Sequence, residues 1–413
     1  MTAPLACRFC GTDVTFEACS LGDQPLANNL VPMAAPAEPD PRFPLCVMVC
    51  SNCLLVQLER TTPPATMFGE YSYLSGISAS WRDHTSRFAT MAAKRFALTA
   101  DSLVIEVGSN DGTLLRELQT HGIRCLGIDP AANVAEAARR DGVPTLTAYF
   151  GGQTAAALLR DGKRADLLVA NNVLAHAPAL TDFVRALALV LAPRGVLSIE
   201  VPHVLAMLRD AEFDTIYHEH VFYFSALVLR RILSSVGLAI FDVETLQTHG
   251  GSLRLFVQHA DTGLQMPTGA LDEVIAAELA ASLDQPNRYR MLAEGAARII
   301  GGMQKFLGQV RHNGASVAAY GAAAKGTMLL NAAGVGPSDI AFIADANPLK
   351  QGHRVPGCRI PIMPPDHIRA ARPEFLLILP WNIADEIMRA TSYIGDWGGR
   401  FVIPSPDLRV IQA

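Results

Sequence analysis

Two pairs of cysteines near the start of the chain constrain its fold more than any other feature. Cys7 and Cys10 form one C-x-x-C unit, and Cys50 and Cys53 form a second. A two-residue gap lets both sulfurs of a pair turn onto one ion, and two such pairs complete a tetrahedral Cys₄ zinc site. The 39 residues between Cys10 and Cys50 exceed the usual loop of a zinc ribbon, so this loop should carry structure of its own. We therefore expect a zinc ion bound near the head of the chain.

The composition narrows the class of protein. The 413 residues suffice for two or three domains, and half of them are hydrophobic. The net charge of −5, with acidic and basic residues mixed, argues against a nucleic-acid partner. No apolar run has membrane-spanning length, and the first residues lack the regions of a signal peptide, so we expect a cytoplasmic protein with no membrane partner. In a reducing cytoplasm paired cysteines act as metal ligands, whereas Cys46 better suits a small apolar role.

Three regions follow one another along the chain. Residues 1–65 form the zinc module, and frequent Gly, Pro and Asn predict irregular structure within it. Residues 66–265 alternate between β-branched runs and helical stretches, which predicts a parallel sheet with helical crossovers. The strands expected in this sheet lie at 102–107, 124–129, 143–147, 165–170 and 195–201.

Two more strands end the middle region, and a second alternating pattern follows. The strands at 238–244 and 252–257 should pair antiparallel, because the short turn H-G-G-S joins them. Residues 269–313 read as helical. From Ser316 strands and helices alternate again around the glycine turn Gly321–Gly326, which predicts a second α/β unit over residues 266–413.

A glycine turn follows the first expected strand of the middle region. The segment Glu106–Gly112 reads E-V-G-S-N-D-G, which does not fit the dinucleotide fingerprint G-x-G-x-x-G because its second glycine comes too late. It is similar to the looser turn of S-adenosylmethionine-dependent methyltransferases. Gly108 and Gly112 would let the backbone approach a bulky ligand, and Glu106 could reach the amino group of a methionine moiety. Asp129 ends the second strand about 20 residues on, where an acid can accept hydrogen bonds from two ribose hydroxyls.

The ends of these strands should meet at one edge of the sheet, where parallel sheets bind ligands. The fourth strand ends at Asn171-Asn172, so this pair joins the same edge. A turn whose glycines only shape the backbone is the simpler interpretation, but the acid at the second strand end favours ligand binding. The expected cofactor-binding residues are Glu106, Gly108, Asn110, Asp111, Gly112, Asp129, Asn171 and Asn172.

A polar cluster, Tyr217–His220 (Y-H-E-H), interrupts an apolar stretch after the fifth strand. A metal is one interpretation, but H-E-H lacks the H-E-x-x-H spacing that places two imidazoles on one helix face. General acid–base chemistry fits better, because a histidine is half-charged near neutral pH and a glutamate can orient it. His176 in N-N-V-L-A-H should face the same space. A structural role for these histidines is the alternative, and Tyr71 and Tyr73 could form a lid or simply pack.

These motifs together resemble those of the sugar C-methyltransferases of antibiotic deoxysugar biosynthesis, over essentially the whole chain. The N-terminal region holds the two C-x-x-C units with G-D-Q-P-L-A-N-N between them. The middle region holds E-V-G-S-N-D-G, N-N-V-L-A-H and Y-H-E-H, and the C-terminal region holds G-A-A-A-K-G and D-A-N-P-L-K-Q-G. The resemblance implies an α/β fold with a Cys₄ zinc module, a central Rossmann-like class I methyltransferase sheet, and a second Rossmann-like domain that binds a nucleotide-sugar.

The resemblance also implies a reaction: methyl transfer from S-adenosylmethionine to the carbon beside the keto group of a nucleotide-linked, dTDP-type 4-keto-deoxysugar. A base removes the proton from that carbon, and the enolate attacks the methyl group of the sulfonium. The family's base corresponds to His220, and its other catalytic positions correspond to Tyr217, Glu219, His176 and Tyr71. Tyr217 and a protonated His176 are candidate donors to the enolate oxygen. The zinc is structural, since four thiolates leave no open coordination position.

Lys325 and Tyr73 are the expected substrate-binding residues. Lys325 follows the G-A-A-A turn, where it could meet a phosphate or stay a solvated lysine at a helix start. Three alternatives stay open: a methyltransferase with another small-molecule acceptor, a zinc-dependent interaction protein without catalysis, and a nicotinamide-dependent oxidoreductase that uses Gly321–Gly326 with Asp345 about 20 residues on. We expect a monomer or a weak homo-oligomer.

Overall fold

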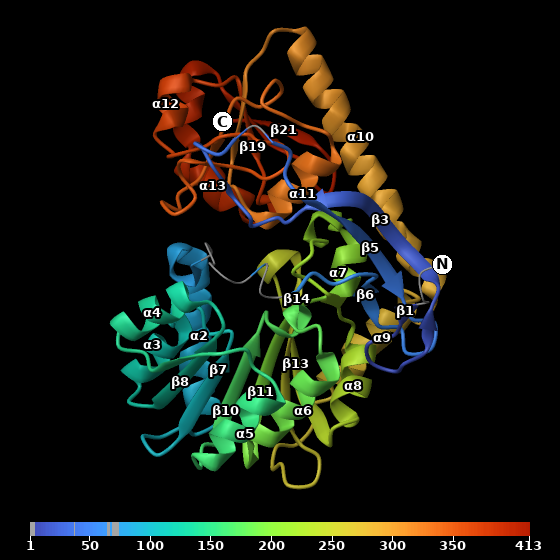
Figure 1. Cartoon of the computed structure of the whole chain (residues 1–413), viewed down its shortest axis with the longest axis vertical. Coiled ribbons are helices and arrows are strands. Elements are labelled where there is room, and N and C mark those ends of the chain that lie inside the picture. Colours follow the sequence, from blue (N-terminus) through green and yellow to red (C-terminus); the bar gives the residue numbers. More distant parts are fainter. Residues whose placement is uncertain (1–4, 37, 64–66, 68–73) are drawn as a thin grey trace.

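The computed structural model describes residues 5–36, 38–63, 67 and 74–413. It consists of an N-terminal antiparallel sheet, a seven-stranded sheet and a six-stranded sheet. In Figure 1 the seven-stranded sheet (cyan to yellow) lies below the six-stranded one (orange to red), and the blue N-terminal strands lie along the long helix α10. The predicted α/β fold, with a second α/β sheet at the C-terminal end, is confirmed.

The N-terminal region is more regular than predicted. Its sheet is antiparallel, in the order β12-β6-β5-β3, and its strands are β3 (Phe16–Pro25), β5 (Arg42–Val49), β6 (Val56–Leu58) and β12 (Phe222–Tyr223). The expectation of an irregular module was wrong, because β5 pairs with both β3 and β6 and buries Leu45, Cys46, Val47 and Val49. A separate hairpin, β1 (Leu5–Ala6) and β2 (Asp13–Val14), holds the first cysteine pair.

The N-terminal region also pairs with both other parts of the molecule. Strand β12 comes from the middle of the chain and pairs with β6. Strand β4 (Val31–Pro32) pairs antiparallel with β17 (His353–Arg354) of the C-terminal region. The first 65 residues therefore do not form an isolated module.

The seven-stranded sheet has the order β13-β14-β11-β10-β7-β8-β9. Its strands are β7 (Leu103–Val107), β8 (Arg124–Asp129), β9 (Thr145–Thr147), β10 (Ala165–Asn171), β11 (Leu191–Pro202), β13 (Leu238–Leu246) and β14 (Ser252–His259). Strands β7 to β11 run parallel, and β13 and β14 pair antiparallel as predicted from the H-G-G-S turn.

Helices cover the faces of this sheet. Helix α6 buries Leu180, Phe183, Val184 and Leu187, the spacing of one helical face. The α-helices are α2 (Ala79–Arg95), α3 (Thr113–Thr120), α4 (Ala132–Arg140), α5 (Gly152–Arg160), α6 (Leu180–Val190), α7 (Val204–Arg209) and α8 (Ala226–Ser234). Short 3₁₀ turns are η1 (Ser75–Ile77), η2 (Leu174–His176), η3 (Phe213–Thr215) and η4 (Thr248–Gly250).

A helical segment leads to the C-terminal sheet. It comprises α9 (Ala270–Ala280), η5 (Pro286–Arg290) and α10 (Met291–His312), and α10 packs against β3. The six-stranded sheet has the order β18-β16-β15-β19-β20-β21. Its strands are β15 (Val317–Tyr320), β16 (Ile343–Ala344), β18 (Ile362–Met363), β19 (Phe375–Ile378), β20 (Arg400–Ile403) and β21 (Arg409–Gln412).

The remaining elements flank this sheet. They are α11 (Ala324–Ala332), α12 (His367–Ala371), η6 (Trp381–Ile383), α13 (Ala384–Ala390) and η7 (Ser392–Trp397). Across the described ranges, no helix is both long and apolar enough to cross a bilayer.

Candidate functional site

The four cysteines of the C-x-x-C units converge. Their sulfurs all lie within 4.8 Å of one another, with Cys7 Sγ 3.6 Å from Cys53 Sγ and Cys10 Sγ 3.5 Å from Cys50 Sγ. A zinc ion with Zn–S bonds of about 2.3 Å places tetrahedral sulfurs about 3.8 Å apart, so the set fits a closed Cys₄ site. Cys46 is not part of this cluster, and burial raises the pKa of its thiol to about 12, consistent with an apolar role.

A cavity of about 850 Å³ lies between the seven-stranded sheet and the C-terminal domain. This volume is in the upper part of the usual range for ligand cavities. All three parts of the molecule contribute to its wall: Asn28 from the N-terminal region, Asp129 and His220 from the middle region, and Lys325 from the C-terminal domain. The cavity therefore brings together residues that the sequence predicted for cofactor, base and substrate.

The glycine turn of the middle domain requires its two glycines. Gly108 and Gly112 have φ values of +69° and +74°, in the left-handed region that favours glycine. A Cβ at Gly112 would lie 2.9 Å from Val143 Cγ2, and one at Gly108 would lie 3.1 Å from Val173 Cγ2. Gly108 lines the cavity, whereas Gly112 begins helix α3.

Two acids lie beside this turn. Burial, together with the charges of Asp111 and Asp129, raises the pKa of Glu106 well above its ordinary value. One oxygen of Glu106 is buried without a hydrogen-bond partner among the described residues. Asp129 accepts hydrogen bonds of 2.9 Å from the backbone N–H groups of Asn110 and Ala131, and burial raises its pKa. These acids fit S-adenosylmethionine, whose ammonium and sulfonium charges would stabilise a buried carboxylate and whose ribose hydroxyls would donate to Asp129.

The side chains of Asn110 and Asp111 bind the backbone of the 3₁₀ turn η1. The backbone N–H of Ser75 donates to Asn110 Oδ1 over 3.0 Å, and that of Gly76 donates to Asp111 Oδ2 over 2.9 Å. Asn110 lines the cavity, but Asp111 does not, and its other oxygen accepts from Thr113 at the start of α3. The role of Asp111 in this structure is to hold η1 and α3 in place.

Asn171 and Asn172 form a corner at the end of β10, and both line the cavity. Asn171 Oδ1 accepts from Ser198 Oγ over 3.4 Å. Asn172 has a φ of +54°, and its side-chain amide has no hydrogen-bond partner among the described residues. A non-glycine residue in this conformation with an unsatisfied amide at a cavity wall is typical of a ligand site.

Two residues of the Y-H-E-H cluster face the cavity. Tyr217 Oη lies 2.7 Å from His220 Nε2, and His220 Nδ1 lies 2.9 Å from the carbonyl of Thr215. A carbonyl can only accept, so Nδ1 carries the proton and Nε2 is the acceptor nitrogen. Burial and the nearby His176 lower the pKa of His220 well below its ordinary value. His220 is therefore a neutral imidazole at neutral pH, and its Nε2 accepts the hydrogen bond of the Tyr217 hydroxyl.

His176 lies against His220, with ring centroids 4.9 Å apart and planes at 75°. Burial lowers the pKa of His176 to about 4. This lowered pKa favours a neutral His176 over the protonated donor expected from the sequence. A neutral His176 can still donate one N–H to a ligand.

The other two residues of the cluster anchor it to the N-terminal region. His218 donates from Nε2 to the carbonyl of Phe43 in β5 over 3.2 Å. Glu219 accepts from Asn28 Nδ2 over 2.6 Å and is buried. Neither residue lines the cavity, whereas Asn28 does. Glu219 thus contacts a cavity residue and does not itself face the ligand space.

Lys325 lines the cavity and is held there. Its Nζ donates to the carbonyl of His249 over 2.9 Å and lies 3.5 Å from Glu212 Oε2. It is not a solvated lysine, since its side chain is 14% exposed. Tyr71 and Tyr73, the predicted lid and substrate residues, lie outside the described residues.

Sequence reasoning missed several residues of the cavity wall. Asn28 and Lys350 lie in the motifs G-D-Q-P-L-A-N-N and D-A-N-P-L-K-Q-G, which were noted without a role for either residue. His249 lies in the H-G-G-S turn, where it adopts a φ of +58°, and His84 lies in helix α2. A polar residue inside each quoted motif was the available signal for the first two. No local signal pointed to His84.

Comparison with known proteins gives matches along almost the whole chain. Family models match a zinc binding domain at residues 7–68, a methyltransferase domain at 73–243 and a C-methyltransferase C-terminal domain at 247–406. The C-methyltransferase NovU of Streptomyces niveus is 35% identical over 407 residues, covering 98% of this chain and 97% of NovU.

Solved structures are similar only in part. The magnesium protoporphyrin IX methyltransferase of Synechocystis PCC 6803 with bound S-adenosylmethionine is 17% identical, with a TM-score of 0.34, over 43% of this chain and 78% of that one. The N-methyltransferase NodS of Bradyrhizobium japonicum is 16% identical, with a TM-score of 0.33, over 44% and 96%. These likenesses are too low to add to the assignment.

The zinc cluster, the seven-stranded sheet and its acidic glycine turn define a zinc-binding, S-adenosylmethionine-dependent methyltransferase. The chain belongs to the C-methyltransferase family, as its match to NovU and to the three family models shows. This assignment favours an enzyme over a non-catalytic interaction protein.

Proposed function

We propose that the protein methylates the carbon beside the keto group of a nucleotide-linked, dTDP-type 4-keto-deoxysugar, with His220 as the base. The observation that carries this proposal is the fixed tautomer of His220. The carbonyl of Thr215 holds the Nδ1 proton, so Nε2 is the basic nitrogen, and it can accept a proton from the acceptor carbon once the Tyr217 hydroxyl turns away from it. When bound, S-adenosylmethionine supplies an electrophilic methyl group.

Neighbouring residues support the chemistry of an enolate. Tyr217 lies 2.7 Å from His220 Nε2 and can turn its hydroxyl toward a developing oxyanion. His176, neutral and 4.9 Å away between ring centroids, is a second donor. Burial lowers the pKa of both histidines, and a buried environment strengthens such hydrogen bonds. A carbon acid needs this help more than an alcohol does, which favours carbon over oxygen as the acceptor atom.

Nucleotide binding in the C-terminal domain is part of the proposal. Lys325 and Lys350 both line the cavity on that side, and paired cations suit a diphosphate. Deoxysugar and antibiotic biosynthesis is the expected context. Mass spectrometry of products from a panel of nucleotide-linked 4-ketosugars tests the substrate class, and no methylated product from any of them would overturn it.

His220→Asn tests the base. The variant keeps a polar group but cannot accept a proton near neutral pH, so kcat should fall about 10²–10⁴-fold while calorimetry shows unchanged S-adenosylmethionine affinity. His218→Asn is the matched control, because His218 contacts Phe43 and does not face the cavity. With a substrate deuterated beside the ketone, wild type without methyl donor should exchange the label and His220→Asn should not. Near wild-type turnover of His220→Asn would move the base to another residue.

A further inference from the structure

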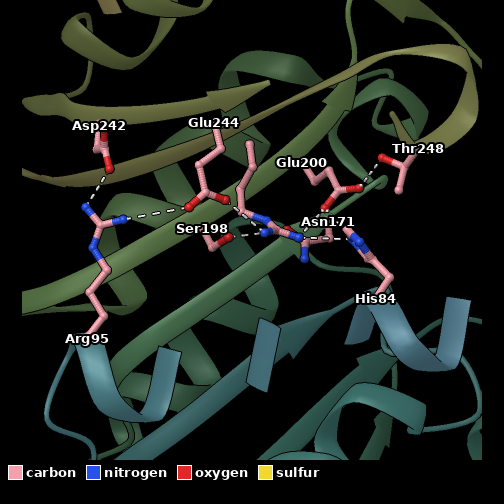
Figure 2. Close-up of polar contacts among 9 residues, drawn as sticks. His84, Arg95, Asn171, Ser198, Glu200, Asp242, Glu244 and Thr248 are labelled. Carbon is pink, nitrogen blue, oxygen red and sulfur yellow. Dashed lines mark hydrogen bonds and ion pairs between the residues drawn. The ribbon is translucent and has the colours of Figure 1, made fainter. Parts of the chain in front are cut away.

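Glu200 is a buried carboxylate that the proposed mechanism does not use. It lies in strand β11, and its side chain has no exposed surface. Three elements contact it (Figure 2): Arg254 Nη2 donates to Oε2 over 3.0 Å, Thr248 Oγ1 donates to Oε1 over 2.9 Å, and His84 Nε2 lies 3.0 Å from Oε2. Burial alone would raise the pKa of Glu200, but the contacts with His84 and Arg254 lower it to about 2. Glu200 is therefore ionised throughout the physiological range.

This carboxylate holds the imidazole of His84 at the cavity wall. The ring stacks on Trp81 with centroids 4.9 Å apart, and both residues line the cavity. Only Nε2 of His84 is engaged, since Nδ1 has no hydrogen-bond partner among the described residues. The side chain is 11% exposed. His84 is thus an oriented imidazole with one ring nitrogen left for a ligand.

The surroundings of Nε2 indicate which kind of group can meet Nδ1. If Nε2 carries the proton, it donates to Glu200, and Nδ1 is an acceptor. If instead Arg254, whose Nη2 lies 2.9 Å from Nε2, donates to it, Nδ1 carries the proton and is a donor. A hydroxyl group both donates and accepts, so it satisfies Nδ1 in either tautomer. A carboxylate, a ketone or an ammonium group would satisfy only one.

The strand order places the contacts of His84 on the opposite side of β10 from Glu106 and Asp129, with Asn171 of β10 paired beside Glu200. Glu106 and Asp129 end β7 and β8, whereas Glu200 and Arg254 belong to β11 and β14, on the other side of β10. The η4 turn beside Glu200 faces the C-terminal domain, because Lys325 donates to the carbonyl of His249 there. The contacts of Glu200 with η4, and of η4 with Lys325 of the C-terminal domain, favour the acceptor as the ligand that meets His84.

We propose that His84 contacts a hydroxyl group of the acceptor and that Glu200 is the positioning residue that holds both His84 and the η4 turn against it. This inference rests on the proposed function, since it concerns the same acceptor site. A polar group that a ligand covers without pairing it discriminates strongly against that ligand. His84 thus becomes a residue that selects acceptors by a hydroxyl away from the reacting carbon.

Steady-state kinetics of the full chain, with the acceptor identified from the ketosugar panel, test the inference. His84→Leu should raise the acceptor KM about ten-fold, the loss of one hydrogen bond to a buried partner, and leave kcat within about two-fold. His84→Asn, whose amide can reach the position of Nδ1, should recover most of that loss. Glu200→Gln should raise the acceptor KM and leave S-adenosylmethionine affinity unchanged.

Arg95→Gln is the matched control. Arg95 ends the same helix and contacts Asp242 and Glu244 in the same polar network (Figure 2), away from the cavity wall. A purely structural network predicts the same kinetics for Arg95→Gln and His84→Leu. That result, or an unchanged acceptor KM in His84→Leu, would overturn the inference while an active wild type upholds the proposed function. A wild type that methylates no member of the panel would overturn the proposed function and the inference with it.

Discussion

The two Rossmann-like sheets each hold an acid on a glycine turn, in the same way. Asp129, at the end of β8, accepts one hydrogen bond from the backbone N–H of Asn110 in the first turn and one from the backbone N–H of Ala131. Asp345, directly after β16, likewise accepts from the backbone N–H of Ala322 in the second turn over 2.7 Å and from the backbone N–H of Asn347 over 2.8 Å. The backbone device is shared, although the two segments show no close sequence repeat.

The charges around the two turns differ. Glu106 precedes the first turn, unpaired at one oxygen and with its pKa raised by burial and by two neighbouring acids. At the second turn, Lys350 Nζ lies 3.9 Å from Asp345 and donates to the carbonyl of Ala322, and Lys325 follows in helix α11. The first turn therefore suits a cationic ligand and the second an anionic one. The same backbone arrangement can therefore suit ligands of opposite charge, because the charged side chains near the turn differ.

The largest effect is expected from loss of the zinc site, because the zinc domain pairs with the domains that carry both turns. The zinc domain pairs with the methyltransferase part through β6 and β12 and with the C-terminal domain through β4 and β17. Structural zinc sites contribute about 10 kcal/mol of apparent binding free energy near neutral pH, so Cys50→Ser or a chelator should destabilise both halves. Metal analysis should find about one zinc per chain in wild type and in Cys46→Ala, the control. A folded, active protein without zinc would contradict this prediction.

A smaller effect should separate the two turns. Asp129→Ala removes an acceptor for hydroxyl groups and should weaken S-adenosylmethionine binding by about 1–3 kcal/mol. Asp345→Ala should leave that affinity unchanged and weaken binding of a nucleoside diphosphate instead. Calorimetry with each ligand measures both. If the two variants lose S-adenosylmethionine affinity equally, the turns are not independent and the comparison fails.

The smallest expected effect tests whether the carboxylate of Glu106 makes the first turn suit a cationic ligand. Because the folded state raises the pKa of Glu106, the folded protein binds more protons than the unfolded one above the ordinary glutamate pKa, and its stability falls as pH rises. Glu106→Gln should therefore raise Tm by about 2–4 °C, with a larger gain at pH about 8 than at pH about 5. It should also weaken S-adenosylmethionine binding. A Tm gain that does not change with pH would show that Glu106 does not titrate as described.

Local patterns sufficed for the strands that carry the site. The runs before Gly108, at Asp129 and at Asn171 are apolar and end where the turns begin, so the sequence located the ligand edge of the sheet. Family resemblance supplied the rest of the expected site. The structure brings His176, Tyr217 and His220 together as expected.

Other features depend on contacts that no local pattern carries. Strand β12 has two residues, and its partner β6 lies over 160 positions earlier in the chain. Which residues of Y-H-E-H face the cavity depends on Phe43 and Asn28, which belong to another part of the fold. The lowered pKa of His176 follows from its burial, which the sequence alone does not give. The prolines before β5, and Pro44 within it, argued against a strand at these residues in the sequence.

Strand β12 also limits how the protein can be recombined. It begins two residues after His220 and completes a sheet whose other strands belong to the zinc domain. A chimera that exchanged only the middle segment with that of a relative would have to rebuild this strand pairing, and with it the position of His220. A mismatched pairing would also leave the edge of β6 open to other chains. The middle segment should therefore be exchanged together with its own zinc domain.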